Sequence, residues 1–247
     1  MVSQLQPPTS SEVIYPDSDG QPMANNTTQF RWIVVIQQNL DWLFADDPNV
    51  FVAGDLFWYP VQGKSNIVNA PDVMVVLGRP KGDRGSYQQW REEDIAPQVV
   101  FEIISPGNSQ EEMEKKLLFY DRYEVAEYYI YDPERNQLRG WLRSEEGLDV
   151  IPQMVDWVSP QLGIRFAWSE EGLELYRPNG ERFLTYTEIS QRLEEQQQQL
   201  EEERQRAEQA EQARRDAIPR LLGMGLSVEQ VAEALGLSMD EVQASNL

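Results

Sequence analysis

The sequence predicts an α/β fold in which helices flank a mixed β-sheet, followed by a long C-terminal helix and a small helical hairpin. Short apolar runs bounded by Gly, Pro and Asn recur at the length of strands. The run over residues 99–104 precedes a helical pattern and then another strand pattern, an order that implies a right-handed crossover. Residues 186–218 are rich in Gln, Glu, Arg and Ala, which predicts the long helix.

The elements of the body follow in order. Apolar residues over 30–44 have helical spacing, so this segment is expected to cover one face of the sheet. Strand patterns occupy residues 51–59, 73–77, 99–104 and 127–131. A turn over residues 105–109 can cap a helix predicted over 111–123. Later strand patterns are 138–143, 162–168 and a hairpin of 174–176 with 182–185.

We expect four segments: a mobile N-terminal arm (1–28), an α/β domain (29–185), a long helix or weak coiled coil (186–218) and a small helical hairpin (219–247). The long helix carries a thin apolar stripe of Ile189, Leu193, Leu200, Ala207 and Ala210, which predicts a homo-oligomer formed through this helix. The hairpin has the pattern of a helix-turn-helix, but it lacks a basic recognition face. Contact with a protein is therefore favoured over reading of DNA.

Composition excludes several classes of chemistry. The 247 residues contain no histidine and no cysteine, so Ser-His-Asp and Cys-His catalysis, zinc sites with nitrogen or sulfur ligands, and disulfides are excluded. Oxygen ligands remain, and these suit hard cations such as Mg²⁺ or Mn²⁺. No apolar run reaches the roughly 18 residues that a membrane span requires. We therefore expect a cytoplasmic protein without a membrane partner.

The net charge of −21 argues against general affinity for nucleic acid, since Lys and Arg normally supply phosphate binding. Any contact with DNA must be local. The loop over residues 79–91 follows the second strand pattern and contains Arg79, Lys81 and Arg84 with two aromatic residues, which makes it a candidate DNA contact. A solvated loop with Trp90 packed beneath it is an equally good interpretation.

One carboxylate stands inside an apolar strand. Glu102 interrupts the run over 99–104, and an ionised carboxylate in such a place needs a partner or a metal. Asp72 opens another apolar run, although after Pro71 it is by itself more typical of a turn. Two strands that each begin or carry an acid predict a metal site, to which the main-chain carbonyl of Ile103 is a further candidate ligand.

A lysine completes the set. Lys115 and Lys116 each follow a glutamate by four residues, which taken alone is the spacing of a surface ion pair. Lys116 also shares a helix face with Met113, Leu117 and Tyr120, so its stem can run toward the sheet and its ammonium toward the acids. Asp72, Glu102 and Lys116 are a nuclease-like constellation, because metal-dependent phosphodiester hydrolysis uses acids to hold the ion and a cation to stabilise developing charge.

The motifs of residues 70–72, 100–108, 112–120 and 125–133 together resemble the Uma-type restriction-endonuclease family, which is abundant in cyanobacteria and is a branch of the PD-(D/E)xK nuclease superfamily. The resemblance covers about residues 30–185. It implies a restriction-endonuclease-like fold and Mg²⁺-dependent cleavage of DNA. It makes Asp72 and Glu102 the metal ligands and Lys116 the catalytic cation.

The chain departs from that pattern at three places. The superfamily usually places its lysine two residues after the acid, where this chain has Ile104, so the cation has to come from the helix. The family commonly has a glycine where this chain has Glu124. Related proteins often carry an acid in the first helix, for which Asp55 is a candidate substitute.

Two other interpretations remain open. A degenerate nuclease fold can serve as a protein-interaction or oligomerisation module, which the acidity of the chain and the absent near-acid lysine favour. A nuclease-fold subunit can also depend for its activity on a partner bound by the tail.

Overall fold

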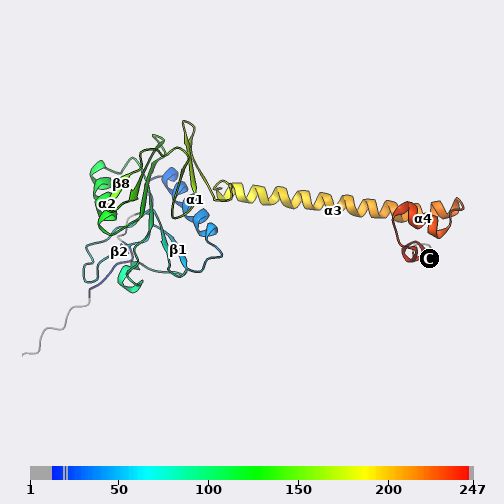
Figure 1. The fold of residues 1–247 in the computed structure, drawn as a ribbon, viewed down its shortest axis with the longest axis horizontal. Helices are drawn as coiled ribbons and strands as arrows, with labels where there is room; N and C mark the ends of the chain where they lie inside the picture. Colours follow the sequence, from blue (N-terminus) through cyan, green and yellow to red (C-terminus); the bar gives the residue numbers. More distant parts are fainter. Residues whose placement is uncertain (1–12, 19, 21, 245–247) are drawn as a thin grey trace, which may run out of the picture. The chain divides into compact units, whose positions relative to one another are not determined.

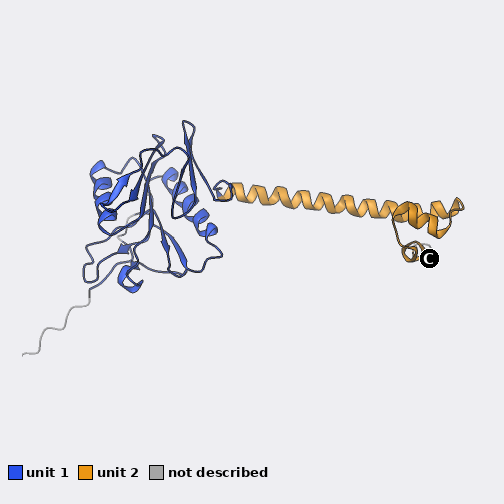
Figure 2. Ribbon diagram, in the orientation of Figure 1, with its two compact units in different colours: residues 1–185 blue, residues 186–247 orange. Residues whose placement is uncertain are grey.

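The computed structural model describes residues 13–18, 20 and 22–244. They divide into two compact units, with the boundary between Thr185 and Tyr186 (Figure 2). The helices are α1 (Thr27–Leu43), α2 (Gln110–Arg122), α3 (Tyr186–Gly223), α4 (Val228–Leu235) and α5 (Met239–Ala244), with a short 3-10 helix over Gln89–Arg91. The strands are β1 (Val50–Gly54), β2 (Trp58–Tyr59), β3 (Val73–Leu77), β4 (Tyr87–Gln88), β5 (Val99–Ile103), β6 (Glu127–Asp132), β7 (Gln137–Arg143), β8 (Leu148–Val150), β9 (Trp157–Val158), β10 (Arg165–Ser169) and β11 (Gly172–Tyr176).

The first unit is built on a six-stranded sheet with the order β1-β3-β5-β6-β7-β8 (Figure 1). Strands β5 and β6 are parallel and are joined by α2, whereas the other neighbouring pairs are antiparallel. The predicted crossover and the predicted mixed sheet are therefore confirmed. A three-stranded sheet of β11, β10 and β9 and a two-stranded sheet of β2 and β4 complete the unit.

Helices α1 and α2 cover opposite faces of the sheet (Figure 1). Ile33, Ile36 and Leu40 of α1 join a core cluster that includes Phe101, and Tyr120 of α2 joins a second cluster that includes Val100. Alternate residues of a strand point to opposite faces, so β5 needs apolar side chains on both. This explains its continuous apolar run, and it places Glu102 on the α2 face with Val100.

Two elements differ from the sequence prediction. The strand expected over residues 51–59 is divided, because the backbone at Asp55 adopts a left-handed conformation with φ of 48° and redirects the chain after β1. The expected hairpin of residues 174–176 with 182–185 reduces to a single bridge between Tyr176 and Arg182. Strand β11 pairs along its length with β10 instead.

The N-terminal arm expected over residues 1–28 lies partly outside the described residues. Its described part contacts the body, since the Tyr59 hydroxyl donates a hydrogen bond to the Pro16 carbonyl over 2.7 Å. The Tyr15 ring lies 4.8 Å from the Trp90 ring. Helix α1 begins at Thr27, where the Asn26 side chain accepts a hydrogen bond from the Gln29 amide.

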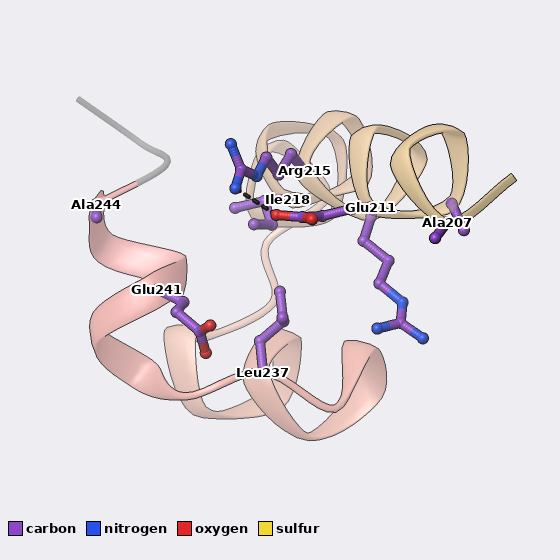
Figure 3. A pocket seen from close by; sticks show the side chains of 9 residues that line it. Ala207, Glu211, Arg215, Ile218, Leu237, Glu241 and Ala244 are labelled. Carbon is purple, nitrogen blue, oxygen red and sulfur yellow. Dashed lines mark hydrogen bonds and ion pairs between the residues drawn. The ribbon is translucent and has the colours of Figure 1, made fainter. Parts of the chain in front are cut away.

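The second unit consists of α3 and the pair α4 and α5. Helix α3 continues through Pro219 to Gly223, beyond the end expected at residue 218. A proline removes one helical hydrogen bond, but the last turn of α3 is held by packing of Ile218 with Val231 and Val242. A cavity of about 670 Å³ is lined by α3, by α5 and by Leu237, which precedes α5 (Figure 3). None of the described helices is both long enough and apolar enough to cross a membrane.

Candidate active site

Asp72 and Glu102 meet on the α2 face of the sheet. Strands β3 and β5 pair in a register that places Val73 beside Phe101, so one further step places Asp72 beside Glu102. Both carboxylates are buried, with 7% and 3% of their residue surface exposed. The Asp72 carboxylate also accepts a hydrogen bond from the Ile103 amide over 2.6 Å. The structure therefore brings together the two acids that the sequence singled out.

Gln29 is a member of the site that the sequence reasoning missed. It is 5% exposed on α1, and its side-chain amide donates a hydrogen bond to the Ile103 carbonyl over 2.9 Å. Its side-chain oxygen accepts a hydrogen bond from the Asn25 amide. A carbonyl oxygen has two lone pairs, so Ile103 keeps one for another ligand. The only sequence signal was a polar residue at the start of an amphipathic helix, which is too common to be informative.

Helix α2 supplies two donors to Glu102. The Lys116 ammonium lies 2.7 Å from Glu102 Oε2, and the Tyr120 hydroxyl donates to Glu102 Oε1 over 2.5 Å. Residues four apart lie on one helix face, which lets both side chains reach the same carboxylate. Lys115 forms the surface pair instead, with its ammonium 2.6 Å from Glu111 and 72% of its side chain exposed.

Burial and charge change the proton affinity of these groups. Burial, reinforced by the negative charge of Glu102, raises the pKa of Asp72 to about 8 despite the opposing effects of Lys116 and the Ile103 amide. Burial lowers the pKa of Lys116, but the attraction of Glu102 and Asp72 outweighs it and leaves that pKa above the ordinary value. Lys116 is therefore a fixed cation at neutral pH. When both Asp72 and Glu102 are ionised, the site holds more negative charge than this one lysine compensates.

The site opens into a cavity of about 670 Å³. Asp72 and Lys116 line it, as do Gln29, Glu112 and Asp55. The charge of Asp55 contributes to the raised pKa of Asp72. Asp55, the candidate substitute for an acid in the first helix, thus faces the same cavity from the end of β1.

The three cations of the loop over residues 79–91 lie elsewhere. Arg79 and Arg84 both contact Glu92, with their nearest nitrogens 3.0 and 2.7 Å from its carboxylate oxygens. Lys81 lies 3.2 Å from Asp41. Lys81, Arg84 and Asp41 line a separate cavity. Neither Asp72 nor Glu102 lines that cavity. The structure does not bring these cations to Asp72 and Glu102.

The model of a family described as "Uma2: Putative restriction endonuclease" matches residues 11–214, which is more than half of the chain. The chain belongs to the Uma2 family. The resemblance drawn from the sequence motifs is confirmed, and membership indicates a nuclease of restriction-endonuclease type.

No curated protein matches this Uma2-family chain. A crystal structure described as a putative nuclease belonging to DUF820, from Anabaena variabilis, shares 16% sequence identity with a TM-score of 0.41. The alignment covers 55% of this chain and 72% of the Anabaena chain. A likeness of that degree carries no argument about function.

The donor set of the Uma2-family site fits a hard divalent cation. Among the described residues, no group of three or more acidic side chains is arranged to hold a metal. Mg²⁺, however, is commonly held by one or two carboxylates with water and substrate phosphate completing its shell. The site offers two buried carboxylates and the Ile103 carbonyl, which has a free lone pair. The pKa of Asp72, raised to about 8, indicates that the negative charge of the ionised acids is not fully compensated.

Proposed function

We propose that this protein is an endonuclease that hydrolyses phosphodiester bonds of DNA with the aid of Mg²⁺ or Mn²⁺. The observation that supports it best is the contact of Lys116 with Glu102, beside Asp72 and at the wall of an open cavity. Acids that hold a cation and a lysine that remains charged are what this chemistry requires. Membership of the Uma2 family supports the same class of activity.

Each residue has a distinct role in this proposal. Asp72 and Glu102 would hold the cation through their carboxylate oxygens, with the Ile103 carbonyl as a neutral ligand. When bound, the cation lowers the pKa of attached water and offsets charge on the phosphate. Lys116 orients the attacking water and stabilises the negative charge that develops on the phosphate oxygens. Gln29 fixes the Ile103 carbonyl, and the Ile103 amide fixes the Asp72 carboxylate. These oxygens therefore need little reorganisation to hold a cation.

The loop cations remain a proposed DNA contact. Arg79, Lys81 and Arg84 can reach phosphate only by exchanging their present partners, Glu92, Glu93 and Asp41. Replacing all three with glutamine tests this role when duplex binding is measured against salt. A less steep salt dependence in a folded variant supports the contact. Unchanged binding at low salt removes the loop from the proposal.

A role in self-association is favoured by the surface of α3. Leu193 and Leu200 are 53% and 69% exposed, and Ile189 is 36% exposed on the same stripe. Exposed leucines at heptad spacing favour pairing with a second copy of the helix. The second candidate function, an interaction module that has lost catalysis, rests on this surface and on the net charge of −21.

Calorimetry and a nicking assay separate the two functions. Mg²⁺ and Mn²⁺ are titrated into the wild-type protein, Glu102→Gln and the control Glu111→Gln, which changes an exposed glutamate of α2. The same three proteins are incubated with supercoiled plasmid. Loss of both binding and nicking in Glu102→Gln alone is the expected result. A wild-type protein that neither binds the ions nor nicks the plasmid would instead favour the interaction module.

A further inference from the structure

A smaller cavity of about 260 Å³ adjoins the cavity that Asp72 and Lys116 line, which is called the catalytic cavity below. Asn108 lines both, and the smaller one is also lined by Arg135, Gln137 and Arg139. Asn108 is held in place, because its side-chain oxygen accepts hydrogen bonds from the amide and hydroxyl of Ser105 over 2.9 and 3.0 Å. The wall between the two cavities is therefore a fixed turn, and a chain-like ligand that fills one cavity can continue past it into the other.

Strand pairing places Arg139 on the catalytic face of the sheet. Glu102 of β5 pairs with Ile130 of β6, and Ile130 pairs with Arg139 of β7. Directly paired residues point to the same face, so Glu102, Ile130 and Arg139 form one row across three strands. Neighbouring strands are about 4.8 Å apart, which puts the Arg139 backbone about 10 Å from that of Glu102.

Arg139 is also an uncompensated charge. Arg135 lies 3.2 Å from Asp132, which balances the one acid in the lining of the smaller cavity. Arg139 is exposed and has no ion pair within the described part of the chain. In a protein with a net charge of −21, a free guanidinium in a cavity beside the catalytic acids is suited to an anion.

We propose that Arg139, assisted by Gln137, binds a backbone phosphate of the nucleic-acid strand whose scissile bond lies at Asp72 and Glu102. This inference rests on the proposed function. Each nucleotide of a strand carries one phosphate, so a separation of about 10 Å lets Arg139 reach a phosphate close to the scissile bond on the same strand. The subsite holds the strand in register and does not depend on base sequence.

The test measures binding of a fluorescein-labelled duplex oligonucleotide by anisotropy across a series of salt concentrations, in EDTA and in Ca²⁺. Arg139→Gln is compared with Arg139→Lys and with Arg122→Gln. The control removes the same charge from an exposed arginine at the C-terminal end of α2, whereas the subsite lies at its N-terminal end. We expect Arg139→Gln to weaken binding and to flatten the slope of log K against log salt by about 0.9, and Arg139→Lys to retain the slope.

Plasmid cleavage in Mg²⁺ is measured on the same proteins. This distinguishes failure of the phosphate subsite at Arg139 from failure of the proposed nuclease activity. If the slope of Arg139→Gln equals that of Arg122→Gln, or if the wild-type protein does not bind the duplex in either buffer, the subsite is refuted. If the wild-type protein binds with the expected dependence on Arg139 but does not cleave, the phosphate subsite stands and the nuclease proposal fails.

Discussion

The Lys116 ammonium lies 2.7 Å from Glu102 Oε2, although the lysine is on α2 and the glutamate on β5. The position two residues after Glu102 is Ile104, so β5 itself provides no lysine beside the acid. The crossover folds α2 back over β5, so the helix brings a lysine to the carboxylate from above the sheet. The lysine beside Glu102 is thus supplied by α2 and not by β5.

Removal of Lys116 should be costly. Lys116→Met leaves a buried Glu102 with only Tyr120 as a donor, and loss of one partner of a buried ion pair costs about 3 kcal/mol of unfolding free energy. Nicking of plasmid should also be lost. Lys115→Met is the matched control, because its pair with Glu111 is exposed. Urea denaturation measures the stability of both variants. Equal denaturation midpoints for Lys116→Met and Lys115→Met would contradict a structural role of the Lys116 contact.

Asp72 should make stability dependent on pH in EDTA. Its pKa is raised by burial to about 8 in the folded protein, whereas the unfolded value is about 3.9. The folded state therefore binds a proton more tightly, and stability is lost as pH rises from about 4 to about 8. Asp72→Asn keeps an acceptor for the Ile103 amide but removes the charge. We expect this variant to melt above the wild type at about pH 8 and close to it at about pH 4.

The control for this experiment is Asp149→Asn, an exposed position on β8. Its melting temperature should differ from the wild type by the same small amount at both pH values. Mg²⁺ should raise the melting temperature of the wild type at high pH but not that of Asp72→Asn, because the metal requires the ionised carboxylate. A parallel pH dependence of Asp72→Asn and wild type would show that another group is responsible.

Replacing Glu124 with glycine should stabilise the protein. It follows α2 with φ of 65°, a left-handed conformation that costs a residue with a Cβ roughly 1–2 kcal/mol. Since glycine is freer in the unfolded chain, we expect Glu124→Gly to raise the unfolding free energy by about 0.5 kcal/mol. Glu145→Gly, in an exposed turn without positive φ, should give no gain in the same thermal melts.

The stripe on α3 should determine self-association. Leu193→Gln combined with Leu200→Gln removes exposed apolar surface and retains good helix formers. We expect a reduced mass in light scattering after size exclusion. The control, Gln198→Ala with Gln205→Ala, changes side chains off the stripe, on which the apolar residues lie at 193 and 200. An unchanged mass in the leucine variant, or a monomeric wild type, would contradict pairing through this helix.

The sequence was most informative where local pattern and fold agree. The apolar run over 99–104 is buried on both faces in β5, and the helical spacing after it belongs to α2. The sequence was least informative where a single backbone angle or a contact between helices decides the course of the chain. Left-handed φ at Asp55 divides an expected strand, and packing of Ile218 keeps α3 intact past Pro219. Neither the φ of a single aspartate nor a contact between helices can be read from periodicity.

The sequence by itself indicated the α/β class, the family motifs and the three residues Asp72, Glu102 and Lys116. Glu102 interrupts an apolar strand, Asp72 opens another apolar run, and Lys116 shares a helix face with apolar residues. Only the tertiary structure decided which partners those residues have. It paired the loop arginines with Glu92, added Gln29 and Tyr120 to the site, and placed Arg139 in one row with Glu102. These relationships join residues far apart in the chain, and they depend on strand register and helix packing, which residue spacing along the chain does not encode.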